Sequence, residues 1–161
     1  MKNTSRHVSF LLLVFVFMFS ACRANVSRNA DGSLTVETTI TQDELQAAIT
    51  AAIADPLITE LNVSLQSGYA LVNGTRQRLN DPSKNDTLSF RLDLGVSNGQ
   101  LTATVSDALL DGKPMEQNRI DHWNETIASR LLIAGKKNPN SSIQLVSITP
   151  EAVTMAWVVS K

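Results

Sequence analysis

Few side chains of this chain could carry out chemistry, and their spacing does not combine them into a catalytic group. Cys22 is the only cysteine, and His122 is the only histidine beyond position 7. Nucleophilic catalysis needs a nucleophile, a base and a third group that orients the base, and nothing in the spacing places such partners around His122. A zinc site needs three or four Cys or His ligands. We therefore expect a non-enzymatic protein without metal or cofactor.

Two other groups of polar side chains suggest binding. One loop carries oxygen ligands that suit calcium but lacks the order and the glycine of an EF-hand, so a solvated loop is the simpler interpretation; its residues are Asn80, Asp81, Asn85 and Asp86. Arg76, Arg78 and Arg91 fall on neighbouring predicted strands and could cluster on the solvent face of a sheet. They could contact lipid headgroups or a carboxylate, although an exposed charged sheet face also explains them.

Cys22 follows a segment that is typical of secretion signals. Lys2 and Arg6 precede an uncharged apolar stretch, residues 8–19, which is too short to span a membrane. The small residues Ser20 and Ala21 then come directly before Cys22, an arrangement that resembles the lipobox of bacterial lipoproteins, with Phe19 where Leu is commonest. The resemblance implies cleavage before Cys22 and a diacylglycerol on its thiol, with a further acyl chain possible on the new amino group; radioactive palmitate would label such chains. The alternative is an ordinary secretion signal with a free cysteine beside the cut.

Three segments follow from this interpretation. Residues 1–21 are predicted to be a lipoprotein signal peptide, 22–32 a lipidated, flexible tether, and 33–161 a single domain. The protein would then be extracytoplasmic and anchored to the bacterial membrane through Cys22. Without the leader, twelve Lys and Arg face fifteen Asp and Glu. There is no basic stripe, so we do not expect a nucleic-acid partner.

The first half of the domain shows one helix between strands. Residues 34–40 alternate apolar and polar side chains, as a half-buried strand does. Thr41 and Glu44 form a capping box that begins a helix, and Asp55-Pro56 ends it. Strands are then predicted at 61–66, at 69–79 with Gly74 as a bulge or bend, at 88–97 and at 101–105. Asn98-Gly99 between the last two is a strong hairpin signal.

The second half predicts one more helix and two strands. Pro114 suits the first turn of a helix, and apolar residues spaced by three and four give that helix a single stripe, at Ile120, Trp123, Ile127, Leu131 and Ala134. Lys136 and Lys137 favour its end. Strands follow at 143–148 and 153–159. The order βαββββαββ predicts an α+β fold in which one twisted antiparallel β-sheet is covered on one face by two helices.

The stretch LSFRLDLGVSNGQLTATVSDALLDGKPM, residues 88–115, is similar to a known family. A long strand, an Asn-Gly turn, a second strand and then Leu-x-Gly-x-Pro before a helix resemble the LmeA-like envelope lipoproteins. These lie near the tubular lipid-binding (TULIP) superfamily, in which a curved sheet wraps a helix and holds acyl chains in an apolar groove. The resemblance implies lipid binding and brings no catalytic residue with it.

The sequence leaves two functions open. In the first, the membrane-tethered lipoprotein binds a lipid or another hydrophobic ligand in an apolar groove between sheet and helices. The candidate groove residues are Phe90, Leu92, Leu94, Leu101, Ala103, Trp123, Ile127, Leu131, Met155 and Trp157. In the second, the same residues fill a solid core, and the lipoprotein binds a protein partner through the solvent face of its sheet. A one-sided apolar sheet under apolar helices is compatible with both.

Overall fold

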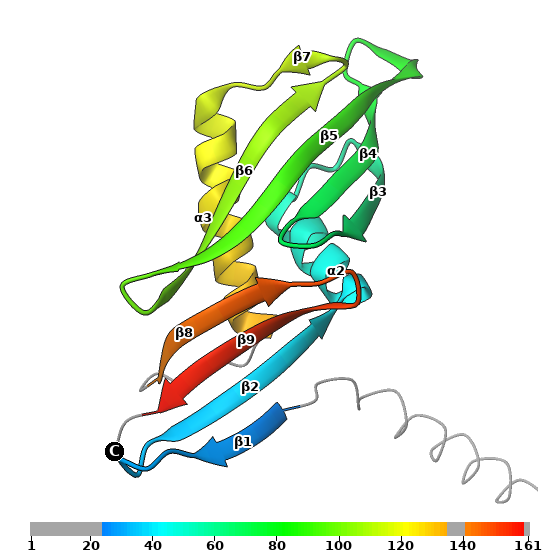
Figure 1. Ribbon diagram of the computed structural model, residues 1–161. Helices are drawn as coiled ribbons and strands as arrows, with labels where there is room; N and C mark the ends of the chain where they lie inside the picture. The colour runs from blue at the N-terminus through cyan, green and yellow to red at the C-terminus, as the bar shows by residue number, and fades with distance from the viewer. Residues whose placement is uncertain (1–23, 135–140, 160–161) are drawn as a thin grey trace, which may run out of the picture.

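The computed structural model describes residues 24–134 and 141–159, and within them the chain forms two helices and nine strands (Figure 1). In chain order these are β1 (Ala24–Arg28), β2 (Leu34–Thr41), α2 (Gln42–Ile53), β3 (Ile58–Leu65), β4 (Ala70–Arg78), β5 (Asp81–Ser97), β6 (Gln100–Leu110), β7 (Lys113–Pro114), α3 (Gln117–Ala134), β8 (Ser141–Ile148) and β9 (Ala152–Val159). The predicted α+β class is confirmed. The signal segment and Cys22 lie outside the described residues.

The strands form two antiparallel sheets, so the prediction of a single sheet was wrong. The terminal sheet has the order β1-β2-β9-β8, and the central sheet has the order β3-β4-β5-β6-β7. Strand β8 connects them, because the Ile143 N–H donates to the Gly99 carbonyl at 2.9 Å and the Gly68 N–H donates to the Ile148 carbonyl at 2.9 Å. Alternation along each strand could not show this division, since it reveals faces and not neighbours.

Helix α2 begins and ends where the sequence predicts. The Glu44 N–H donates to Thr41 Oγ1 at 3.3 Å, and the Thr41 N–H donates to Glu44 Oε2 at 2.8 Å, which completes the capping box. The helix ends at Ala54, which has a left-handed φ of 48°. The Asn98-Gly99 hairpin is also confirmed: both residues have positive φ, 51° and 71°, between the paired Ser97 and Gln100.

Three local predictions were wrong. Residues 24–28 form strand β1, paired with β2, instead of part of a flexible tether. Residues 81–86 belong to β5 instead of a loop, because β5 continues to pair with β4 there and Asp86 lies opposite Arg76. Helix α3 begins at Gln117 and not near Pro114, because the Met115 N–H bonds the Ala108 carbonyl at 2.9 Å and keeps this segment against β6.

The bulge predicted at Gly74 lies in the partner strand. The register shift is in β3, between Ile58 and Glu60, and Gly74 pairs with Leu61. A Cβ atom at Gly74 would lie 2.5 Å from the Glu60 carbonyl oxygen, closer than real Cβ contacts. The glycine is thus required by the close approach of the neighbouring backbone.

Both helices pack against the central sheet (Figure 1). Their side chains also accept hydrogen bonds from backbone N–H groups at its edges. Gln42 and Gln46 of α2 accept from the backbone N–H groups of Leu65 at 3.3 Å and Val63 at 3.1 Å. From α3, Asn124 Oδ1 accepts from the Val105 N–H at 2.7 Å. These side chains take backbone donors of β3 and β6 that would otherwise be open to another strand.

Candidate functional site

The predicted groove residues come together in one buried apolar cluster. Leu92, Ile127, Leu131 and Met155 are fully buried. The others are at most 7% exposed, apart from the half-buried Leu94: Phe90, Leu101, Ala103, Trp123 and Trp157. They belong to a cluster of buried side chains contributed by both helices and both sheets. The structure therefore places them as core residues that pack against one another.

One aromatic contact joins the central sheet to α3, and one hydrogen bond holds Trp157 within the terminal sheet. The rings of Phe90 and Trp123 lie 5.4 Å apart, centroid to centroid, at 44°. The Trp157 indole N–H donates to Thr38 Oγ1 at 3.0 Å, and no buried side-chain nitrogen or oxygen of the described residues lacks a partner. A lipid could reach the fully buried side chains only if packed elements of the fold separated. A groove here stays a prediction.

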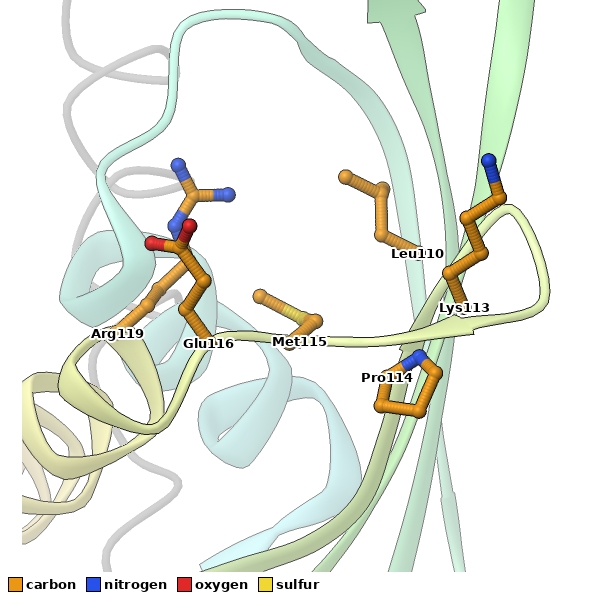
Figure 2. A pocket seen from close by; sticks show the side chains of 6 residues that line it. All are labelled: Leu110, Lys113, Pro114, Met115, Glu116 and Arg119. Atoms are coloured by element: carbon orange, nitrogen blue, oxygen red, sulfur yellow. The ribbon is translucent and has the colours of Figure 1, made fainter.

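A pocket of about 300 Å³ lies where β6 and β7 lead into α3, and none of the predicted groove residues lines it (Figure 2). Its lining is Leu110, Lys113, Pro114, Met115, Glu116 and Arg119. Of these side chains, that of Met115 is half-buried, and the charged ones are exposed. The volume is at the lower limit for a small-molecule site, and the walls carry both signs of charge. The pocket therefore indicates no particular ligand.

The three arginines do not form the cluster that the sequence suggested. Arg76 continues the inward alternation of β4 and pairs with Asp55 at 2.8 Å. Arg78 pairs with Asp86, through its Nε at 2.7 Å, and with Asp111 at 3.2 Å. Burial acts to raise the pKa of Asp55, but the hydrogen bonds from Arg76 and from the Leu57 N–H outweigh burial and lower it. These pairs set two arginines against three aspartates at one end of the central sheet.

Arg91 lies on the opposite, outward face, in a group that we call the outer patch: Tyr69, Leu71, Arg91 and Asp93. The Arg91 guanidinium carbon lies 4.0 Å from the centre of the Tyr69 ring. Its Nε and Nη2 atoms donate to the two oxygens of Asp93 at 2.7 and 2.6 Å. Leu71 pairs directly with Arg91 across β4 and β5 and is 38% exposed.

The electrostatics of the outer patch favour one arrangement of these side chains. The hydrogen bond from Arg91 lowers the pKa of Asp93, and the same bond raises the pKa of Arg91. The pair is therefore charged over the whole physiological range and carries no net charge. The sequence interpretation named Arg91 but missed Tyr69 and Leu71, because their proximity to Arg91 depends on the register between β4 and β5. It also missed Asp93, although the alternation along the predicted strand already places Asp93 two residues from Arg91 on the same face.

The other polar residues considered for chemistry are the residues around Asp81 and the histidine of α3. In the segment considered for calcium, Asp81 accepts from the Ser83 hydroxyl at 2.6 Å and pairs with Lys84 at 2.9 Å. His122 is exposed on α3. Across residues 24–134 and 141–159, no three His, Cys, Asp or Glu side chains are grouped so as to hold a metal ion. No helix in the same ranges is long and apolar enough to cross a membrane.

Comparison of the chain with protein-family models, with curated proteins and with solved structures gave no match. The resemblance to the LmeA-like lipoproteins thus stays a prediction from the sequence.

Proposed function

We propose that this chain is a membrane-tethered, non-enzymatic lipoprotein that binds a protein partner through the outer patch. The tether is the acylated Cys22 predicted from the sequence. The observation that carries the binding role is the arrangement of half-buried Arg91, stacked on Tyr69 and held by Asp93, beside exposed Leu71.

The outer patch has the composition of a binding hot spot. Tyr and Arg are the residues most often found to dominate binding energies, and they act best beside apolar contacts. Because Asp93 and Tyr69 already fix Arg91, a partner would not have to order that side chain, which avoids part of the conformational-entropy cost of binding. Asp93 takes two guanidinium N–H groups, which leaves the others to donate to a partner.

The packing of the core favours this function over lipid binding. Lipid binding in the predicted groove needs Leu92, Ile127, Leu131 and Met155 to contact a ligand, and all four are fully buried against other side chains. Protein binding at the outer patch requires no such opening. Since the Arg91–Asp93 pair is neutral overall, we expect the interaction to depend on stacking and hydrogen bonds and to respond only weakly to salt.

Site-specific photo-crosslinking in cells tests the proposal. A photoreactive amino acid replaces Leu71 in the full-length protein, and the same amino acid replaces Glu125, an exposed residue of α3, as the control. We expect one discrete protein adduct from position 71 and none from position 125. Equal adducts from both positions, or no adduct from position 71, would contradict a partner at the outer patch.

A further inference from the structure

Strand β1 begins close to the predicted anchor. Its first residue, Ala24, pairs with Thr38, and the pairing with β2 continues through Arg28 opposite Leu34. Ala24 follows Cys22 by two residues, and two residues span at most about 7 Å even when fully extended. If Cys22 carries a lipid, the folded domain therefore starts within about 7 Å of the anchored residue.

The surface at this position suits a lipid interface. Strand β1 is the outer strand of the terminal sheet, and all five of its residues are exposed. Val26 is 63% exposed and pairs with Val36, while Leu34 is 36% exposed and lies opposite Arg28. Apolar side chains beside an arginine fit the headgroup region, where the guanidinium can stay hydrated while its methylenes contact apolar groups. The strand contains no acidic residue that anionic lipids would repel.

We propose that the β1 edge of the terminal sheet lies on the membrane surface and fixes the orientation of the domain. This inference rests on the acylation of Cys22 in the proposed function. The β1 edge contacts the headgroup layer of the same bilayer that holds the lipid anchor. A flexible tether of eleven residues would let the domain take any orientation relative to the membrane. Two residues followed by a paired strand restrict that orientation.

The orientation has a consequence for the outer patch. The terminal sheet has the order β1-β2-β9-β8, and the central sheet contacts its far strand, β8 (Figure 1). Three strand spacings of roughly 4.8 Å separate β1 from β8, so the central sheet stands at least about 14 Å from the β1 edge. The outer patch is thus held above the headgroups, at a height where it meets membrane proteins and not the lipid itself.

Fluorescence quenching of the anchored protein tests this orientation. Val26→Cys provides a single free thiol in the acylated, full-length protein, which is labelled with an environment-sensitive fluorophore. Asn73→Cys, on the exposed side of β4, is the control. Both are reconstituted into phosphatidylethanolamine–phosphatidylglycerol vesicles that carry a headgroup nitroxide. We expect several-fold stronger quenching at position 26 than at position 73. Equal quenching at the two positions would overturn the inference. A protein strand bound to β1 would also shield position 26 from the nitroxide and give this contradicting result.

Three further measurements support this test and keep the inference separate from the proposed function. Leu34→Cys serves as a second label on the same edge if Val26→Cys does not fold. A protein that never associates with vesicles, and whose mass shows no acyl chain, contradicts the anchor instead of the orientation. Inserting about a dozen Gly and Ser residues after Cys22, which span roughly 19 Å on average, should keep the protein anchored but lower the quenching at position 26 several-fold. Unchanged quenching at position 26 would contradict the inference, because the short tether would then not fix the orientation of the domain.

Discussion

Arg91 lies over the aromatic ring of Tyr69, with its guanidinium carbon 4.0 Å from the ring centre. The face of the ring attracts a cation in this position, and the attraction becomes stronger if a partner removes the surrounding water. Asp93 holds the other side of the guanidinium. The exposed face of the central sheet thus contains an ordered group of side chains, which sets it apart from an ordinary charged surface.

The solid core predicts a large difference between two neighbouring residues of α3. Leu131 is fully buried, while Ile133 is 68% exposed. We expect Leu131→Ala to lower the free energy of unfolding by about 2–5 kcal/mol, because it leaves a cavity in packed surroundings. Ile133→Ala, the matched control, should change it by about 0.5 kcal/mol or less. Urea denaturation measures both.

The same pair of variants distinguishes a packed core from an open groove at Leu131. If Leu131 lined an open groove, its truncation would change stability little and would instead reduce the uptake of a fluorescent fatty acid. Equal stability of Leu131→Ala and Ile133→Ala, together with displacement of the probe by lipid, would favour the groove over the packed core.

Asn124 is predicted to protect the edge of β6. Its Oδ1 accepts from the Val105 N–H at 2.7 Å. Asn124→Leu leaves this partly buried donor without a partner, which should cost about 1–3 kcal/mol of stability and speed amide exchange at Val105. Gln117→Leu, which removes a surface hydrogen bond to Asp121 on the same helix, is the control. Unchanged exchange at Val105 in the Asn124 variant would contradict this role.

The Asp55–Arg76 pair predicts a loss of stability in acid. Because the pKa of Asp55 is lowered in the folded protein, the carboxylate contributes stability above its unfolded pKa of about 3.9 and loses it as the pH falls through the folded value. Asp55→Asn should therefore destabilise the protein at neutral pH and reduce the decline in stability below about pH 4. Glu125→Gln provides an exposed control. If the free energy of unfolding depends on pH in the same way for wild type and Asp55→Asn, the Asp55–Arg76 pair does not cause the loss of stability in acid.

The predicted anchor has a direct test of its own. Cys22→Ser should release the protein from membranes and abolish its labelling with radioactive palmitate, because serine has no thiol to carry the diacylglycerol. Retention in the membrane fraction together with palmitate incorporation would contradict the anchor at Cys22. Serine preserves the size and polarity of the position, so folding of the domain should not change.

The sequence predicts features of the fold that depend on local chemistry. The capping box of Thr41 and Glu44 begins α2, and Asn98-Gly99 makes the hairpin, because each depends on a few consecutive residues. The apolar spacing of Trp123, Ile127 and Leu131 likewise predicts the buried face of α3.

Features that depend on long-range pairing could not be predicted in this way. Strand β1 has a polar sequence and is a strand because it pairs with β2. Residues 81–86 have loop composition, but ion pairs and the ladder with β4 keep them extended. The outer patch depends on the register that places Leu71 opposite Arg91, and no local pattern encodes that register.

The most direct test of partner binding at the outer patch is the crosslinked adduct from position 71 in two charge-reversal variants. Arg91→Glu removes the guanidinium that stacks on Tyr69, and Lys84→Glu makes the same charge change at an exposed position of the same strand. We predict that Arg91→Glu abolishes the adduct, while Lys84→Glu preserves it at the wild-type yield. An adduct that persists in Arg91→Glu, or that both variants reduce equally, would contradict the account.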